Sequence, residues 1–401
     1  MQLLFNVSMI NFHKKFVYLI LFLSAGSALM AQTKSYLTLS YELQSLQKQL
    51  VPDKRVAILN VKFVDTLQAQ IVVKGETDLP SAKLQIIQLL KDNRIPFVDS
   101  LRLLPDAVLG DKTWALATLS VSNIRALPDD ASELVSQAMM GTPLKVLDFT
   151  GKWYRIQTPD QYIGWMDPAG LHLISLTELD QWKRSTRFMF NSISGYVYDA
   201  PNRRGKVVSD LVLGDLLEVE SKVRGFLKIR IPDGRYGYVR KSDCISYNKW
   251  SNLEPKVGSI LSVASQMMGF PYLWGGASSK AADCSGFVKL IFYSQGIILA
   301  RDASQQARYG ESLDFNKLDN LQPGDLLFFG SSPQRISHVG IYLGKGDFIH
   351  DSGRVLISSI DPSDPKYSPV RKNQVARRIF NSLNTEGIVR VKDHPWYSTK
   401  Y

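Results

Sequence analysis

The stretch AADCSGFVKLIF, residues 281–292, places one cysteine directly ahead of an apolar run. The apolar residues recur at helical spacing, so the stretch predicts an amphipathic helix with Asp283 as N-cap and Cys284 in its first turn. Because a helix N-terminus favours an anion, we expect a lowered pKa for the Cys284 thiol, as a nucleophile near neutral pH requires. A free cysteine is more often a small buried hydrophobe, so the rest of the chain must decide between the two interpretations.

The composition is that of a globular protein. The chain has 401 residues, of which 45% are hydrophobic and 21% charged, and this length has room for roughly two to four domains. The net charge of +11 would suit an acidic partner such as nucleic acid, anionic lipid or an anionic cell-wall polymer. The basic residues are scattered along the chain, which also fits an ordinary solvated surface.

Residues 1–31 have the pattern of an export signal peptide. A basic flank precedes a short apolar core, and small residues lead to Ala31, after which we expect cleavage. The apolar core is too short to predict a membrane span. We therefore expect an exported protein, periplasmic or extracellular and soluble after cleavage, for which nucleic acid is an improbable partner.

The chain has two cysteines, Cys244 and Cys284, too few for a disulfide framework in an exported protein of this length. A disulfide between them would silence Cys284 as a nucleophile. The sequence leaves both redox states open.

Residues 34–118 predict a small N-terminal α/β unit. SYELQSLQKQL and SAKLQIIQLLKDNRI have helical spacing, whereas VAILNVKFVD, QAQIVVKG and TWALATLSV are β-branched and alternating. One sheet with two helices would bury these apolar faces. The unit offers no candidate site, and we expect a spacer or docking role.

Two similar stretches follow, and they predict two small all-β barrels, residues 119–178 and 190–250. Each combines short strands with turn signals and has a Tyr–Gly–aromatic step near its end, beginning at Tyr162 and at Tyr236. The stretch LDQWKRSTRF between them predicts a short helical linker. The two barrels resemble bacterial Src-homology-three modules, which tether exported enzymes to the cell wall.

Residues 255–401 predict an α+β domain. VGSILSVASQMMG and DCSGFVKLIFYSQ predict helices, LQPGDLLFFG predicts a turn and a buried strand, and SHVGIYLGKGDFIHDSG predicts a hairpin. Helices that precede an antiparallel sheet are typical of this fold class.

The predicted hairpin contains two histidines, His338 and His350. If Gly346 supplies the left-handed residue of a three-residue loop, Leu343 pairs with Asp347, and the two histidines share one face of the sheet. A two-residue loop would place them on opposite faces.

With the odd loop, His338 can accept the proton of Cys284, and His350 can hold the His338 imidazole in the required tautomer. This is the chain order of papain-like enzymes. A metal site is the rival use of histidines, but no Asp, Glu or Cys set with ligand spacing accompanies them, so we expect neither a metal nor a cofactor.

Residues 257–353 resemble an NlpC-type cysteine peptidase through the ordered motifs PYLWGG, DCSGF, PGDLLFF, SHVGIYLG and FIHDSG. With the two barrels ahead of it, this domain makes the chain similar to the γ-D-glutamyl-L-diamino acid endopeptidases, which cut murein peptides. The resemblance implies Cys284 as nucleophile, His338 as base and His350 as third catalytic residue.

The same resemblance implies a set of substrate contacts. Tyr272 would help to stabilise the oxyanion, and Asp283 and Ser285 would contact the substrate beside the thiol. The motif RDASQQ offers Ser304, and also Arg301, for substrate carboxylates.

In that subgroup the first barrel selects peptides with a free L-alanine amino terminus through an acid and a tyrosine. Here SELVSQ supplies Glu133 and DQYIGW supplies Tyr162. A solvated loop charge explains Glu133 equally well, and barrel core explains Tyr162.

The expected function is hydrolysis of the bond between the D-glutamate γ-carboxyl and a diamino acid in murein-derived peptides, with cell-wall polymer as a further partner. Two alternatives stay open. One is a murein amidase or an endopeptidase that acts on the intact wall. The other is a catalytically silent wall-binding protein in which Cys284 is bridged to Cys244.

Overall fold

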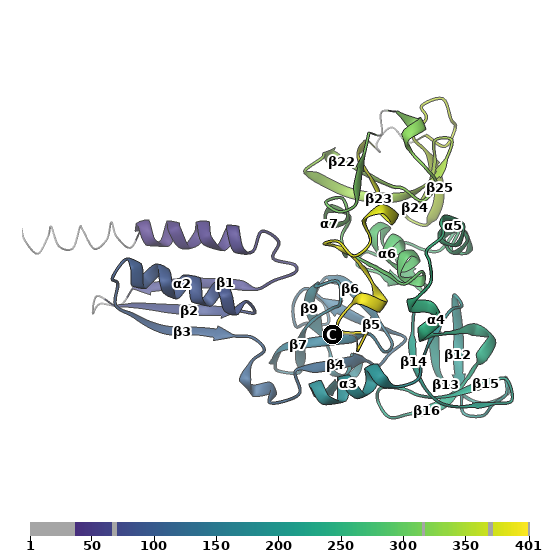
Figure 1. Cartoon of the computed structure of the whole chain (residues 1–401), viewed down its shortest axis with the longest axis horizontal. Coiled ribbons are helices and arrows are strands. Elements are labelled where there is room, and N and C mark those ends of the chain that lie inside the picture. The colour runs from purple at the N-terminus through teal and green to yellow at the C-terminus, as the bar shows by residue number, and fades with distance from the viewer. Residues whose placement is uncertain (1–36, 66–69, 315–316, 368–371, 400–401) are drawn as a thin grey trace, which may run out of the picture. The chain divides into compact units, whose positions relative to one another are not determined.

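The computed structural model describes residues 37–65, 70–314, 317–367 and 372–399 (Figure 1). The expected signal peptide, residues 1–31, lies outside the described residues. The chain divides into two compact units, Met1–Leu104 and Pro105–Tyr401. Within the described ranges, every helix is too short or too polar to cross a membrane.

The first unit packs two helices on a three-stranded sheet. The helices are residues 37–50 and α2 (Pro80–Asp92), and the strands are β1 (Leu59–Asp65), β2 (Ile71–Thr77) and β3 (Phe97–Leu103). β2 lies between antiparallel β1 and parallel β3, and α2 forms the crossover that a parallel pair requires. Apolar residues of both helices and all three strands form one core, as the alternating pattern predicts.

The prediction that TWALATLSV belongs to this unit is wrong. Its residues form β4 (Trp114–Ala117), which pairs with β7 (Pro143–Thr150) and β10 (Leu171–Ile174) in the second unit. Ala115 and Ala117 are fully buried there. Alternation identifies a strand but not its partner, which tertiary packing selects.

The first β domain, as we call strands β4–β10, is an antiparallel sheet of order β10-β4-β7-β8-β9-β5-β6. The remaining strands are β5 (Val121–Arg125), β6 (Leu134–Met139), β8 (Trp153–Gln157) and β9 (Ile163–Met166). β6 lies at the edge of this sheet and contacts the strand that follows the PYLWGG motif. The first β domain therefore lies against the segment that leads to Cys284.

The second β domain, as we call strands β11–β17, follows the helix α3 (Leu176–Arg184). A capping box between Ser175 and Glu178 starts α3, and this confirms the predicted helical linker. The sheet order is β13-β12-β16-β15-β14-β11-β17. The strands are β11 (Arg187–Phe190), β12 (Ser194–Tyr198), β13 (Val207–Val212), β14 (Leu216–Val223), β15 (Phe226–Arg230), β16 (Tyr236–Arg240) and β17 (Cys244–Ser246).

The C-terminal part has the predicted α+β layout. Its helices are α4 (Tyr247–Ser251), α5 (Val257–Gln266), α6 (Cys284–Ser294) and α7 (Ala303–Gln306). Its antiparallel sheet has the order β21-β26-β22-β23-β24-β25. These strands are β21 (Glu311–Leu313), β22 (Leu326–Ser332), β23 (Arg335–Gly344), β24 (Asp347–Asp351), β25 (Val355–Ser359) and β26 (Asn373–Arg378).

Short elements complete the domain. Two small sheets pair β18 (Ala277–Ser278) with β19 (Ala281–Ala282), and β20 (Ile297–Leu299) with β27 (Ile388–Arg390). Single 3₁₀ turns occur at Ala107–Leu109, Pro168–Gly170, Lys241–Asp243, Leu318–Asn320, Phe380–Ser382 and Val391–Asp393.

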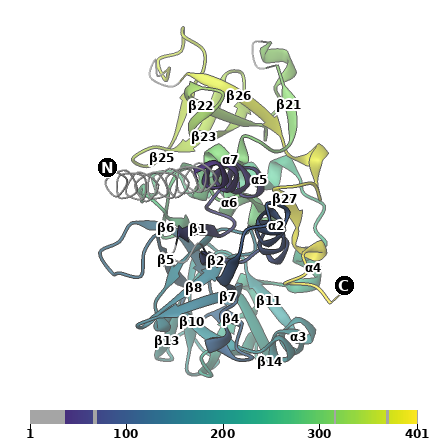
Figure 2. The same cartoon turned by 90° about the vertical axis from the view of Figure 1, so that its left-hand side faces the viewer.

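Helix α6 forms the centre of the second unit. It lies between the six-stranded sheet and β6 of the first β domain in both views (Figures 1 and 2). The helix is confirmed. The expectation of an amphipathic helix with one exposed face is wrong, because every α6 residue except Lys289 is buried. Both faces are covered, one by the sheet and the other by the first β domain.

Candidate active site

Cys284 is the first residue of α6, and Asp283 is its N-cap, as the sequence predicts. Asp283 Oδ1 accepts hydrogen bonds from the Gly286 N–H at 2.7 Å and from the Ser285 hydroxyl at 3.0 Å. A Cβ on Gly286 would lie 2.0 Å from the carbonyl oxygen of Gly276. Only glycine therefore lets the first turn of α6 pack this closely on the preceding loop.

The Cys284 thiol is buried, and its pKa differs from the sequence-based expectation. Burial, together with the smaller effect of the Asp283 carboxylate, raises the pKa of Cys284 to about 12. Hydrogen bonding by the backbone N–H groups of Val339 and Ser285 opposes this shift but is the weaker effect. The expected lowered pKa is therefore wrong for the ligand-free enzyme, because the helix terminus is desolvated and its cap is an anion. The alternative disulfide is also absent, since Cys244 and Cys284 are both free.

His338 lies on β23 and His350 on β24, at the two sides of one hairpin. The turn has two residues, Lys345 and Gly346, both with positive φ, and Gly344 pairs with Asp347. The predicted three-residue loop with a Leu343–Asp347 pair is thus wrong.

A β-bulge between Tyr342 and Gly344 supplies the odd residue instead. It restores the predicted register beyond it: a Cβ on Gly340 would lie 3.1 Å from the Cβ of His350. The two histidines therefore share a face, although the loop itself has an even number of residues.

The two imidazoles form part of a hydrogen-bonded chain. His338 Nε2 lies 2.7 Å from His350 Nδ1, and His350 Nε2 lies 2.9 Å from the Ser358 hydroxyl. Both rings are buried, and the planes of the two rings are nearly perpendicular. Sequence reasoning missed Ser358, which lies on β25 as a diagonal neighbour of His350.

The chain of hydrogen bonds has a direction if His338 is to act as a base. A neutral His338 that accepts a proton at Nδ1 must carry its own proton on Nε2 and donate it to His350 Nδ1. His350 then carries its proton on Nε2 and donates to Ser358 Oγ. The opposite direction would put a proton on His338 Nδ1, where a base could not use it. The thiol of Cys284 accepts a hydrogen bond from the N–H of Val339, the residue after His338, so the thiol lies beside β23.

Tyr272 is held next to the thiol by two backbone contacts. Its N–H donates to Gly353 O at 3.0 Å, and it forms a parallel bridge with Ala282, two residues before Cys284. Burial raises the pKa of the Tyr272 hydroxyl, and the negative forms of Cys284, Asp283 and Asp351 raise it further. The phenol is therefore a hydrogen-bond donor at neutral pH.

Arg301 is fully buried and joins Asp283 to the first β domain. Its guanidinium donates to Asp283 Oδ1 at 3.0 Å and to Oδ2 at 2.6 Å, and its Nε donates to Ser136 Oγ on β6 at 3.1 Å. A further bond of 3.1 Å reaches the Ser285 hydroxyl. Burial alone would raise the pKa of Asp283, but the Arg301 ion pair and hydrogen bonds lower it.

These contacts occupy Arg301 with internal partners rather than with solvent. Asp283 and Ser285, the predicted substrate contacts beside the thiol, take part in the same network. Ser304 lies half-buried on α7, whose Gln306 donates to the Ser285 carbonyl at 3.2 Å. The structure thus brings the RDASQQ motif to the start of α6.

The first β domain brings Glu133 to the PYLWGG segment. Glu133 is exposed, and its Oε1 accepts a hydrogen bond of 2.6 Å from Trp274 Nε1. Tyr162 is buried, and its carbonyl accepts from the Thr158 N–H and hydroxyl. The burial of Tyr162 also fits the interpretation as barrel core.

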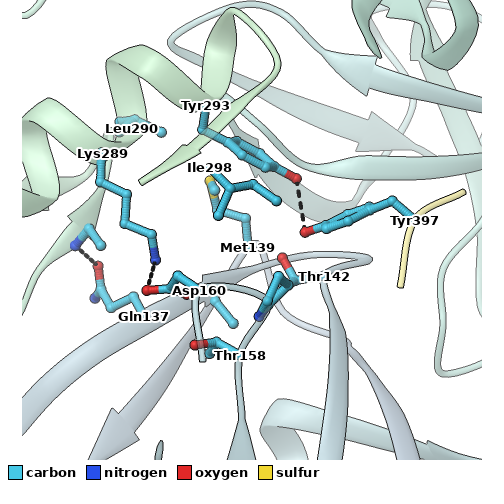
Figure 3. A pocket seen from close by; sticks show the side chains of 13 residues that line it. Gln137, Met139, Thr142, Thr158, Asp160, Lys289, Leu290, Tyr293, Ile298 and Tyr397 are labelled. Atoms are coloured by element: carbon cyan, nitrogen blue, oxygen red, sulfur yellow. Dashed lines mark hydrogen bonds and ion pairs between the residues drawn. The ribbon is translucent and has the colours of Figure 1, made fainter. Parts of the chain in front are cut away.

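A separate cavity lies between the first β domain and the later turns of α6 (Figure 3). Lys289 Nζ lies 2.8 Å from Asp160 Oδ2 there, and the hydroxyls of Tyr293 and Tyr397 are 3.4 Å apart. Its lining includes neither Cys284 nor the two histidines, so it is distinct from the candidate active site.

The geometry agrees with a family relationship. Residues 269–378 match the NlpC/P60 family, and residues 124–171 match the bacterial dipeptidyl-peptidase Sh3 domain. The chain therefore contains an NlpC/P60 peptidase domain. This peptidase has several domains, SH3-like and NlpC/P60 among them, and is predominantly β with few helices.

Curated relatives match this peptidase over most of their own length. It is 28% identical to the gamma-D-glutamyl-L-lysine dipeptidyl-peptidase of Bacillus cereus over 235 residues, which cover 55% of this chain and 68% of the relative. It is 26% identical to dipeptidyl-peptidase 6 of Lysinibacillus sphaericus over 63% of this chain and 94% of the relative. The crystal structure of an NlpC/P60 family protein from Bacillus cereus matches with a TM-score of 0.58 and 23% identity, over 66% of this chain and 99% of that one, and so shares the fold.

Proposed function

We propose that this peptidase hydrolyses the bond between the γ-carboxyl of D-glutamate and a diamino acid in murein-derived peptides. The observation that carries the proposal is the arrangement of Cys284 at the N–H of Val339, next to His338, whose Nε2 is engaged by His350. A thiol, an imidazole and an orienting group in this order support nucleophilic catalysis of acyl transfer. Two curated relatives are named gamma-D-glutamyl-L-lysine dipeptidyl-peptidase, which supports the choice of the γ-D-glutamyl bond.

In the proposed reaction, His338 Nδ1 takes the thiol proton as Cys284 Sγ attacks the carbonyl carbon. The carbon–sulfur bond forms, the carbon–nitrogen bond breaks, and the diamino acid leaves with the proton that His338 carried. Water, deprotonated by His338, then hydrolyses the thioester and releases L-Ala-γ-D-Glu with the free thiol. His350 keeps the base in its tautomer, and the Tyr272 hydroxyl donates to the oxyanion.

We propose that side chains around the thiol select the substrate. Glu133 would receive the ammonium of L-alanine, with Tyr162 as its partner. Asp283, Ser285 and Ser304 would contact the acyl part of the peptide.

We also propose that residues 1–31 direct export, and that the mature protein works as a periplasmic or extracellular enzyme on murein peptides, with cell-wall polymer as a further partner. The pattern of these residues supports this location. N-terminal sequencing of the protein purified from the producing cell is expected to begin after Ala31. An intact N-terminus would overturn the proposal.

The proposed activity is tested with the peptide L-Ala-γ-D-Glu-L-Lys and with its diaminopimelate counterpart. Wild type is expected to release L-Ala-γ-D-Glu, detected by mass spectrometry, whereas Cys284→Ala releases none. Cys244→Ala is the matched control, because Cys244 lies on β17 in the second β domain, and it is expected to stay active. Release of fragments from intact wall, but no dipeptide from the free peptides, would favour the alternative wall endopeptidase.

A further inference from the structure

Asp351, the last residue of β24, has a buried carboxyl group without a partner. The residue is 1% exposed, and neither carboxyl oxygen has a hydrogen bond within the described residues. An unpaired polar group is costly to bury, and an unpaired charge is costlier still. Such a group in a native structure therefore points to a partner that arrives with a ligand.

The position of Asp351 places this group near Tyr272, the proposed oxyanion donor. Asp351 follows His350 on β24, so its side chain leaves the sheet on the opposite face. Gly353, two residues after Asp351, accepts the hydrogen bond from the Tyr272 N–H at 3.0 Å. The negative form of Asp351 acts on the Tyr272 hydroxyl, and the charge of Asp283 acts on Asp351.

Among the described residues, no cationic side chain acts on Asp351. Tyr272 is a neutral phenol, and Asp283, the charge that acts on Asp351, is itself neutralised by Arg301. A carboxylate accepts hydrogen bonds only, and an ammonium group supplies both the donors and the opposite charge. The chemistry of the site therefore fits an amine on the substrate.

Two carboxylates lie at the two ends of the Tyr272–Trp274 segment. Glu133 accepts a hydrogen bond from Trp274, whereas Asp351 acts on Tyr272. The peptide of the proposed reaction carries two ammonium groups, one on each side of the bond that is cut. If Glu133 takes the amino terminus, Asp351 is left for the amine on the leaving side.

We infer that Asp351 binds the side-chain ammonium of the leaving diamino acid and so selects a cationic residue on that side of the cleaved bond. This inference rests on the proposed function. It adds a specificity residue for the leaving group to the contacts proposed for the acyl part.

The first test compares two peptides, L-Ala-γ-D-Glu-L-Lys and the same peptide acetylated on the lysine side chain. Wild type is expected to prefer the free amine about tenfold or more in kcat/KM, as one charge-assisted hydrogen bond allows. Asp351→Asn keeps the shape but removes the charge, and its preference is expected to fall to within about threefold of unity. Asp347→Asn is the matched control, because Asp347 lies on the same strand and pairs with the exposed Lys366.

The second test needs only the wild-type enzyme. Burial raises the pKa of Asp351 to about 7, and the charge of Asp283 adds to the shift. Asp351 is therefore uncharged well below pH 7 and charged above it. The preference for the free amine should rise from near unity at about pH 5 to a plateau above about pH 8. Groups that act equally on both peptides, such as the thiol, the histidines and the alanine ammonium, cancel in this ratio.

The outcomes separate this inference from the proposed function. If both peptides are cut with a ratio near unity, or if Asp351→Asn keeps the wild-type ratio, the inference is overturned and the proposed function stands. If neither peptide is cut, the proposed function falls and the inference falls with it. A ratio that depends on Asp351 and rises through pH 7 supports both.

Discussion

His338 Nε2 lies 2.7 Å from His350 Nδ1 at the centre of a hydrogen-bonded chain that ends at the Ser358 hydroxyl. The two imidazoles therefore have different roles. His338 has one nitrogen that faces away from His350, and this nitrogen alone can exchange a proton with the thiol. His350 uses both nitrogens to orient its neighbour.

Substitutions at these hydrogen-bonded residues are therefore expected to lower kcat by different amounts. His338→Ala should lower kcat by about 10³-fold or more, because it removes the base. His350→Ala should lower kcat less. His350→Asn should be more active than His350→Ala, since an amide oxygen can still accept a hydrogen bond from His338. Ser358→Ala should cost only a few-fold to tenfold, as expected for one neutral hydrogen bond.

Steady-state kinetics on the free peptide measure these effects, with circular dichroism as the check on folding. The orienting role is rejected if His350→Asn is as inactive as His350→Ala. A Ser358→Ala variant as impaired as His338→Ala would contradict the proposed direction of the hydrogen bonds.

The thiol of the ligand-free enzyme is expected to be protonated at neutral pH. Burial raises the pKa of Cys284 to about 12, so the thiolate fraction should rise about tenfold per pH unit up to that value. In a Cys244→Ala background, the rate of alkylation by iodoacetamide should therefore increase steadily from pH 6 to pH 9. A plateau near neutral pH would instead reveal a preformed thiolate–imidazolium pair.

Arg301 is expected to stabilise the fold as well as the site. Arg301→Met leaves Asp283 buried without its counter-charge, which should lower the free energy of unfolding by about 3–5 kcal/mol. Ser136→Ala removes only the bond from β6 to Arg301 Nε and should cost roughly 1.5–3 kcal/mol. Denaturant unfolding measures both, with Arg335→Met on the exposed start of β23 as control. Equal stability of Arg301→Met and Arg335→Met would contradict this assignment.

Local sequence signals were sufficient where neighbouring residues determine the structure. Asp283 as N-cap of α6 follows from residue type and position, and the helical linker follows from the spacing around Trp182. The shared face of His338 and His350 was also predictable, although for the wrong reason. A three-residue loop and a two-residue turn with a bulge give the same register, and residues 343–347 alone do not distinguish them.

Properties that depend on distant segments could not be predicted. The raised pKa of Cys284 arises because the sheet and the first β domain bury the start of α6. The partner strands of β4 lie more than 20 residues further along the chain. Ser358 reaches His350 only through the pairing of β25 with β24, and the sequence after Arg354 matches no known motif that would indicate this contact.

The first β domain is expected to select the amino terminus of the substrate. Glu133 is exposed, and the 2.6 Å hydrogen bond from Trp274 holds it at the PYLWGG segment. A carboxylate fixed there can favour a peptide with a free alanine amine over one whose amine is acylated. Because the group is exposed, its contribution should be smaller than that of a buried pair, roughly fivefold to tenfold in kcat/KM.

Glu133→Gln should therefore reduce cleavage of L-Ala-γ-D-Glu-L-Lys by this factor and leave cleavage of the N-acetylated peptide nearly unchanged. Asp130→Asn, an exposed carboxylate on the same loop, is the matched control and should behave as wild type. Trp274→Phe removes the bond that positions Glu133, so it should lose part of the same preference. If wild type cuts free and acetylated peptides equally well, Glu133 is a solvated loop charge, and hydrolysis of stems still attached to glycan becomes the better interpretation.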